Sequence, residues 1–343
     1  MKKINEDFIK EIKEVIQSSK INFILGAGAS CPYLPLLNDI EEKFVNAKTE
    51  VERTKVCREY FDKVMFPNLD ILNSGSSLDV KAKTKLVNTI STYKSFFKYI
   101  SSILMKRKST LLSKQANIFT TNIDIFNEFS LEELNIEMND GFCGLIKPKF
   151  DPSNFKKSYF KRSLHFELLS EIPTINLVKL HGSLTWMKDK NFKNIEYSRL
   201  SMLNEIHKSS NDLSFIKEYE KLFIINPEKK KLEDTVLDTI YYDLLRIFSE
   251  EMEKENTVLF IIGFSLNDEH IQDLIFRSIN SNPTLKVYIF CYDLNSVTDI
   301  NKKIESQSRK YQNIEIIEPN DNKDENRLEL KVITDSLFNK ILI

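Results

Sequence analysis

The chain alternates between short apolar runs and longer amphipathic stretches over its 343 residues, and this alternation is the strongest constraint on its fold. The apolar runs are nearly continuous and rich in Ile, Val, Phe and Leu, which is typical of strands covered on both faces. Strands are predicted at residues 21–25, 117–121, 175–180, 222–226, 258–262, 285–291 and 314–317. Helices are predicted at residues 6–19, 39–66, 79–108, 232–253, 270–279 and 297–311. Strands that alternate with helices predict an α/β fold with a doubly wound, Rossmann-like parallel sheet of about six strands.

The predicted elements also divide the chain into a core and additions to it. We expect one domain of residues 1–343, with core segments at about 20–30, 115–130, 174–186 and 220–318. Residues 39–112 and 130–172 exceed what a minimal doubly wound unit needs, and we expect them to be helical insertions that form a second subdomain. The polar run at 319–327 predicts a loop before a last helix at 328–343.

The composition is that of an ordinary globular protein. A net charge of −1, with 29% charged and 41% hydrophobic residues, exerts no overall attraction for nucleic acid or an acidic membrane. The N-terminus lacks the apolar run of a signal peptide, and no run approaches the ~20 residues of a spanning helix, so a cytoplasmic location without membrane contact is expected.

Four cysteines are scattered through the sequence, at Cys31, Cys57, Cys143 and Cys291. None forms a C-x-x-C pair, and a zinc ribbon requires two such pairs. The sequence therefore predicts no metal, and free thiols in a reducing compartment.

A glycine-rich turn follows the first predicted strand, with the sequence Gly26-Ala27-Gly28-Ala29-Ser30. A G-x-G turn at the start of a helix allows a phosphate to approach backbone N–H groups. Cys31 stands where the full dinucleotide fingerprint has its third glycine, so the match is partial. The alternative is a tight turn without a ligand.

Polar residues follow two further strands. Thr121, Asn122 and Asp124 come after the strand at 117–121, where Asn and Asp could instead cap a helix. His181 comes after the strand at 175–180, beside Gly182. Histidine is the side chain best suited to proton transfer near neutral pH, although a single histidine after a strand is more often structural.

A similar segment follows the strand at 258–262, where Gly263 and Ser265 precede Asp268. Ser and Asp side chains can bind sugar hydroxyls, or they can cap the helix that starts near residue 270. Ligands of open α/β sheets bind at the carboxyl ends of the strands, and all these segments stand at such ends. We therefore expect them to lie along one edge of the sheet.

In this order, the segments resemble the motifs of the sirtuin family. GAGAS at 26–30, TTNID at 120–124, HG at 181–182 and GFS at 263–265 correspond to the sirtuin G-A-G-x-S, T-Q-N-x-D, H-G and G-x-S motifs. The chain departs from the family in lacking both zinc-binding C-x-x-C pairs and the Pro-Asp-Phe-Arg loop, and in having Thr121 in place of Gln.

The chain is more similar to the sirtuin-like NAD-hydrolysing domains of bacterial antiphage defence systems. Those domains lack the zinc module and share a G-[FY]-S-x-x-D-x-H-I segment, which matches residues 263–271. Residues 222–251 also resemble the subgroup that works with a HerA-type ATPase. The resemblance therefore implies that the chain forms a homo-oligomer and has a HerA-type ATPase as its partner.

The resemblance implies a zinc-independent NAD+ glycohydrolase with NAD as its substrate. The products would be nicotinamide and ADP-ribose, and a triggered enzyme would deplete NAD. Asn122 would orient the ribose hydroxyls and the attacking water, and His181 would act as general base. Asp124 would bind the nicotinamide carboxamide. The remaining implied NAD contacts are Gly26, Ala27, Gly28 and Ser30 at the diphosphate, Gly263, Ser265 and Asp268 at the adenosine side, and Thr121.

Other functions remain open at this point. A non-catalytic sensor or regulatory subunit that binds NAD or ADP-ribose would not need Asn122 and His181. A protein ADP-ribosyltransferase is a further alternative, while the missing zinc module counts against a deacylase. Basic and aromatic residues interleave at 147–162, a composition that can bind nucleic acid, although a solvated loop or subunit contact is the favoured interpretation.

Overall fold

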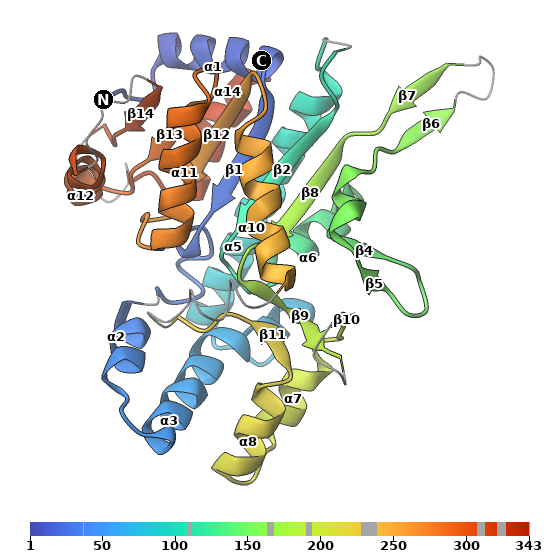
Figure 1. Cartoon of the computed structure of the whole chain (residues 1–343), viewed down its shortest axis with the longest axis vertical. Coiled ribbons are helices and arrows are strands. Elements are labelled where there is room, and N and C mark those ends of the chain that lie inside the picture. Colours follow the sequence, from blue (N-terminus) through green and yellow to red (C-terminus); the bar gives the residue numbers. More distant parts are fainter. Residues whose placement is uncertain are drawn as a thin grey trace.

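A parallel sheet of seven strands, in the order β14-β13-β12-β1-β2-β8-β3, crosses the molecule in the computed structural model (Figure 1). The structure describes residues 1–36, 38–108, 111–162, 168–189, 194–227, 239–306, 313–320 and 327–342. The strands are β1 (Lys20–Leu25), β2 (Gln115–Thr120), β3 (Glu137–Asn139), β8 (Thr174–Lys179), β12 (Thr257–Ile262), β13 (Lys286–Phe290) and β14 (Ile314–Ile317). The α/β class and the parallel sheet predicted from the sequence are confirmed.

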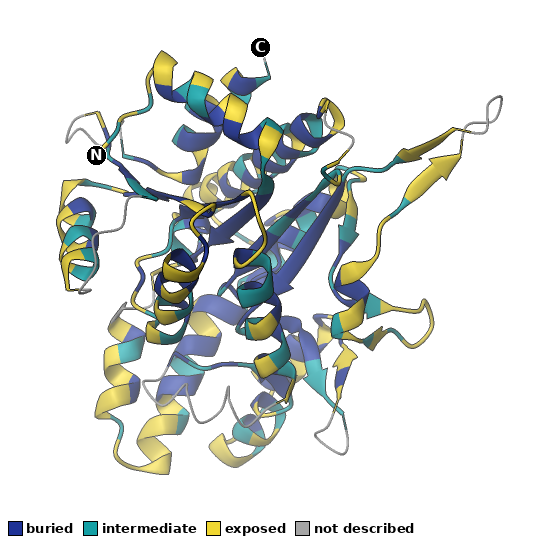
Figure 2. Ribbon diagram, turned by 45° about the horizontal axis from the view of Figure 1, so that its top comes forward, coloured by how far each residue is buried: buried dark blue, intermediate teal, exposed yellow. Residues whose placement is uncertain are grey.

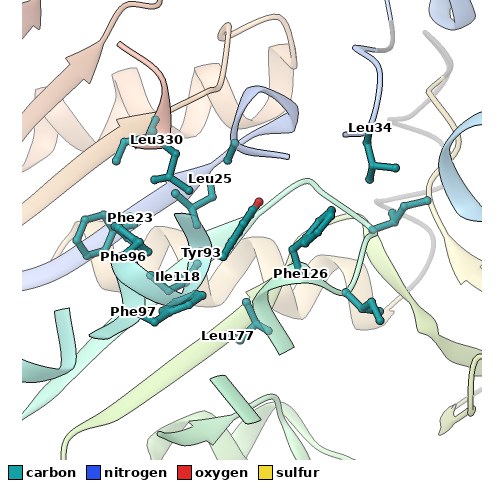
Figure 3. Close-up of a cluster of buried hydrophobic side chains, with 14 of the residues drawn as sticks. Phe23, Leu25, Leu34, Tyr93, Phe96, Phe97, Ile118, Phe126, Leu177 and Leu330 are labelled. Carbon is teal, nitrogen blue, oxygen red and sulfur yellow. The ribbon is translucent and has the colours of Figure 1, made fainter. Parts of the chain in front are cut away.

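Helices cover both faces of this sheet, which explains why its central strands are mostly apolar. In β1, Phe23 and Leu25 pack into one core cluster, while Ile24 between them packs into the other. The first cluster, part of which Figure 3 shows, includes residues of α1 (Glu6–Ser18), α5 (Val80–Met105), α13 (Leu330–Ile333), η5 (Thr334–Phe338) and α14 (Asn339–Ile341). The second includes residues of α10 (Thr239–Met252), α11 (Glu269–Ser281) and α12 (Leu294–Glu305).

More helices and a smaller sheet lie beyond the carboxyl ends of the central strands (Figure 1). The helices are α2 (Asn38–Asn46), α3 (Glu50–Tyr60), η2 (Phe61–Met65), α4 (Asn68–Leu72), α7 (Ser201–His207) and α8 (Asp212–Tyr219). The smaller sheet has the order β11-β9-β10-β5-β4, with β4 (Phe142–Cys143), β5 (Lys149–Phe150), β9 (Gly182–Lys188), β10 (Ile195–Tyr197) and β11 (Leu222–Ile224). These elements face the edge of the parallel sheet where the polar segments were expected.

A hairpin of β6 (Phe160–Arg162) and β7 (Leu169–Glu171) projects from the body of the molecule (Figures 1 and 2). Its residues are mostly exposed, in contrast to the buried strands of the central sheet (Figure 2). A helix of the length and apolarity that a bilayer crossing requires is absent from the described part of the chain.

Three expectations about the fold differ from the structure. The run at 222–226 forms β11, which pairs with β9 in the antiparallel sheet and not with the parallel one. The edge strand β3 was not predicted, because its three residues contain no apolar run. The segment 130–172 was expected to be helical, but after α6 (Phe126–Glu133) it forms short strands and the 3-10 helix η3 (Pro152–Lys156).

The predicted helices at 6–19, 79–108 and 270–279 correspond closely to α1, α5 and α11. The helix predicted at 39–66 is divided in two, because Thr49 forms a capping box with Glu52 and starts a new helix, α3. Parts of the helices predicted at 232–253 and 297–311, and most of the loop predicted at 319–327, lie outside the described residues.

Candidate functional site

The carboxyl ends of four adjacent strands, β12, β1, β2 and β8, lie in one row. The strand register pairs Leu25 with both Ile262 and Thr120, and pairs Thr120 with Lys179. The glycine-rich turn, the Asn122 segment, His181 and the Gly263 loop start directly beyond this row. The edge that the sequence predicted is therefore present. The strand order also reverses at β1, which is where ligands bind in doubly wound sheets.

The glycine-rich turn is pressed against the Gly263 loop. Gly28 N–H donates to Gly263 O at 3.0 Å, and a Cβ added to Gly26 would lie 2.4 Å from the same oxygen. Gly263 has a φ of +65°, and a Cβ there would lie 2.6 Å from Ala29 N. The glycines therefore allow the two turns to approach each other, a structural need that phosphate binding alone would not create.

Four buried side chains form what we call the inner cluster: Ser30, Tyr93, Asn122 and Asp124. Ser30 Oγ donates to Asp124 Oδ2 at 2.6 Å and lies 2.9 Å from Tyr93 OH. Asn122 Nδ2 donates to Ser30 Oγ at 3.2 Å and to Gly26 O at 2.9 Å. A serine hydroxyl has one hydrogen, which goes to Asp124, so Tyr93 is the donor to Ser30. The cluster fixes the Asn122 carboxamide from its nitrogen side.

The Tyr93 ring belongs to the hydrophobic core, while its hydroxyl belongs to the inner cluster. It stacks on Phe126 with ring centroids 5.4 Å apart, and Figure 3 shows it among the apolar side chains. Burial and the charge of Asp124 raise the pKa of the Tyr93 hydroxyl well above its usual value. Tyr93 thus remains protonated and acts as a hydrogen-bond donor.

The Asp124 carboxylate is enclosed by the chain. Its Oδ1 accepts a hydrogen bond from Phe126 N–H at 3.2 Å, so both oxygens have partners. Burial raises the pKa of Asp124, while the charge of Lys179 and the hydrogen bond from Ser30 act in the opposite direction. Lys179 is itself buried; its Nζ lies 2.8 Å from Glu128 Oε1 and also donates to the Asp124 carbonyl oxygen. Lys179 was not among the predicted site residues, although a lysine within an apolar strand indicates a buried partner.

His181 and Asp268 form what we call the outer pair. The imidazole Nε2 lies 3.0 Å from Asp268 Oδ2. Asp268 Oδ1 accepts a hydrogen bond from Ile271 N–H at 3.3 Å and caps α11, so the capping role weighed for Asp268 is confirmed. Next to His181, Gly182 has a φ of +78°, and a Cβ there would lie 2.0 Å from Phe223 O. This glycine lets the chain turn from β8 into β9.

The predicted site residues thus fall into two sets of contacts. Ser30, Asn122 and Asp124 contact each other and the Gly26 turn, whereas His181 contacts Asp268. Three predicted contact residues belong to neither set of side-chain contacts: Thr121 is half-buried beside Asn122, Ser265 is exposed, and Ala27 begins the short helix η1 (Ala27–Ala29). Their roles, and those of the other predicted NAD contacts, stay predictions.

Two further observations bear on the chemistry of the chain. In the residues that the structure describes, His, Cys, Asp and Glu side chains form no group of three or more that could hold a metal ion.

In the segment 147–162, Phe155 is buried and the Phe150 ring packs 5.1 Å from Trp186. These two aromatic rings are engaged within the protein and are not presented for stacking on bases.

A family model and two solved structures are similar to the chain. The model of the SIR2-like domain matches residues 116–317, which is more than half of the chain. A Sir2 structure from work on the mechanism and regulation of Sir2 enzymes is 11% identical and covers 98% of both chains, with a TM-score of 0.44. Sir2Tm bound to a propionylated peptide is 12% identical over 95% of this chain and 98% of its own, with a TM-score of 0.43. No curated protein matches.

Proposed function

Because this chain belongs to the SIR2-like domain family, a family of NAD-dependent enzymes, we propose that it hydrolyses NAD+ to nicotinamide and ADP-ribose. The observation that carries the proposal is the single row of strand ends on which Gly26, Asn122, His181 and Gly263 follow. An extended dinucleotide that lies along this edge would meet a glycine turn, a fixed carboxamide and an imidazole in succession.

The polar groups at this edge suit the parts of the substrate. Asn122 donates a hydrogen bond to Gly26 in the turn at residues 26–30, so the two lie side by side. A diphosphate bound at the turn would therefore place the attached ribose near Asn122. Because the Asn122 nitrogen is engaged by Gly26 and Ser30, its Oδ1 is the atom left to accept hydrogen bonds from ribose hydroxyls or water. Ser265 is exposed beyond β12 and suits a second sugar.

The reaction breaks the bond between C1′ of the ribose and the nicotinamide nitrogen. The bonding electron pair leaves with nicotinamide, which is then neutral and needs no general acid. Positive charge develops on the ribose, as in glycoside hydrolysis, and the oxygen of a water molecule bonds to C1′. His181 takes the proton that this water loses, a role that typically contributes about 10²–10⁴-fold to the rate.

The test is incubation of the purified chain with NAD+, alone and together with the HerA-type ATPase, with the products identified by chromatography and mass spectrometry. Equal amounts of nicotinamide and ADP-ribose are expected from the wild-type chain, with at least about 100-fold less from Asn122→Ala and His181→Ala. Release of cyclic ADP-ribose, or transfer of ADP-ribose to protein, would replace hydrolysis as the reaction. Tight NAD binding without turnover would make the chain a sensor.

We also infer a biological setting from the motifs at residues 263–271 and 222–251, which resemble domains of antiphage defence systems. The chain would deplete NAD when triggered, as a homo-oligomer and together with a HerA-type ATPase. The oligomeric state by light scattering, and NAD turnover with and without that ATPase, test this inference. A monomeric chain whose turnover the ATPase does not change would contradict it.

A further inference from the structure

The outer pair joins two strands that are not neighbours. His181 follows β8 and Asp268 ends the loop after β12, and β1 and β2 separate these strands in the sheet. The imidazole Nε2 and the carboxylate Oδ2 nevertheless lie 3.0 Å apart, in side chains that are only 13% and 7% exposed. The two loops therefore reach toward each other over the ends of the strands between them.

The Asp268 carboxylate is also held from its own side. Its Oδ1 caps α11 through the N–H of Ile271. The loop before it is held by Lys303 of α12, whose Nζ donates to the carbonyl oxygens of Ser265 at 2.7 Å and Leu266 at 3.1 Å. Because the cap and the loop fix the carboxylate, its second oxygen meets His181 in one orientation.

This contact determines which nitrogen of His181 carries the hydrogen. Nε2 lies within ion-pair distance of Oδ2, although the two atoms do not meet the geometry of a hydrogen bond. An ionised carboxylate oxygen repels a nitrogen lone pair at this distance, so the neutral imidazole carries its hydrogen on Nε2. Nδ1 is then the nitrogen with the available lone pair. A carboxylate at this distance from a histidine also favours, through its charge, the imidazolium that forms when the histidine takes up a proton.

We propose that Asp268 is a positioning residue for His181, and not a ligand of the adenosine part of NAD as the motif resemblance implies. Asp268 holds the imidazole in the tautomer whose Nδ1 accepts the proton of the attacking water, and it stabilises the protonated ring. The proposal rests on the proposed function, because it takes His181 to be the base of that reaction.

The first test measures the tautomer, which does not depend on activity. Nitrogen NMR of the chain labelled with ¹⁵N-histidine reports which ring nitrogen is protonated, and His181→Gln identifies the His181 signals among the four histidines. The Nε2–H form is expected in the wild-type chain, and a loss of this preference is expected in Asp268→Asn. A wild-type Nδ1–H form, or an unchanged tautomer in Asp268→Asn, would overturn the proposal.

The second test is the kinetics of nicotinamide release by Asp268→Asn. Asn caps helices about as well as Asp, so the melting temperature should change little. The value of kcat should fall at least about 100-fold, because the imidazole loses its fixed tautomer. The value of KM should stay within about threefold, because substrate binding is not affected. A raised KM with unchanged kcat would make Asp268 a substrate ligand.

The matched control is Asp79→Asn, which makes the same change at the cap of α5. There the Asp79 carboxylate accepts a hydrogen bond from Ala82 N–H at 2.8 Å, so the variant alters a helix cap in the same way. Wild-type kcat and KM are expected from it. If the wild-type chain releases no nicotinamide either alone or with the HerA-type ATPase, the proposed function fails, and the tautomer measurement alone decides the role of Asp268.

Discussion

The inner cluster and the outer pair lie at the same edge of the sheet, but they are built differently. In the inner cluster, four buried side chains from three segments provide one another's hydrogen-bond partners, with Ser30 at the centre. In the outer pair, two side chains from different loops contact each other, and the other oxygen of Asp268 caps a helix. Loss of an inner residue takes partners from two or three buried polar groups at once, whereas loss of His181 removes the neighbour of one atom, Asp268 Oδ2. The inner cluster should therefore govern stability as well as chemistry, and the outer pair mainly chemistry.

The largest effects should come from Asn122→Ala and His181→Ala, which separate the two regions. Both should lower kcat for nicotinamide release by about 10²–10⁴-fold. Asn122→Ala should also lower the free energy of unfolding by about 1–3 kcal/mol, because the Gly26 carbonyl and Ser30 lose their donor. The loss in His181→Ala should be smaller, because one atom, Asp268 Oδ2, loses its neighbour. Urea unfolding measures the difference. Equal losses of stability in the two variants would remove the distinction between the regions.

The glycine-rich turn, which carries Ser30 of the inner cluster, packs against the Gly263 loop, which leads to Asp268 of the outer pair. Gly263→Ala tests this packing. The new Cβ would meet Ala29 N at 2.6 Å in a backbone with positive φ, so a loss of about 2–4 kcal/mol in the free energy of unfolding is expected. The control is Gly75→Ala, at a φ of +62°, where the nearest atoms belong to the side chains of Leu86 and Leu78 at 3.1 and 3.2 Å. It should cost about 1–2 kcal/mol, for the backbone conformation alone. A smaller loss at Gly263 than at Gly75 would contradict the close packing of the two turns.

A smaller effect is expected from Ser30→Ala, which removes the centre of the inner cluster. Asp124 Oδ2, Tyr93 OH and Asn122 Nδ2 would each lose a partner, at a cost of about 1–3 kcal/mol in thermal or urea unfolding. Ser265→Ala, at an exposed serine of the Gly263 loop, should change stability by less than about 0.5 kcal/mol. Similar losses of stability in Ser30→Ala and Ser265→Ala would mean that the hydrogen bonds of the inner cluster do not stabilise the fold.

The smallest expected effect is a dependence of stability on pH that comes from Asp124. Burial raises its pKa in the folded chain above the usual value of 3.8, so the unfolded chain ionises first as the pH rises. The stability of the wild type relative to Asp124→Asn should then decrease as the pH rises from about 4 through the raised pKa. Urea unfolding of both chains across this range measures the difference. A difference that stays constant, or grows with pH, would show that Asp124 does not titrate as a buried acid.

The sequence predicted the central sheet well, because apolar runs covered on both faces leave a strong pattern. The strands at 21–25, 258–262 and 314–317 differ from β1, β12 and β14 by no more than one residue at either end. The pattern did not distinguish β11 from the parallel strands, because an apolar run does not reveal which sheet it joins. The three-residue strand β3 left no pattern, since pairing with β8 creates it.

The candidate site was predicted as a row of strand ends, and this row is present. The partners within it could not be predicted, because they depend on contacts between residues that are distant in sequence. Tyr93 lies in a long amphipathic helix, where an aromatic residue is expected to be part of the core, and only the fold brings its hydroxyl to Ser30. The contact of Asp268 with His181 likewise crosses two strands.

A crystal structure of the chain with a non-hydrolysable NAD analogue tests the central claim most directly. The account predicts the diphosphate against the turn at residues 26–30 and the nicotinamide ribose between Asn122 Oδ1 and His181 Nδ1. An analogue bound elsewhere, or bound at this edge with the imidazole and the carboxamide facing away from the ribose, would contradict it.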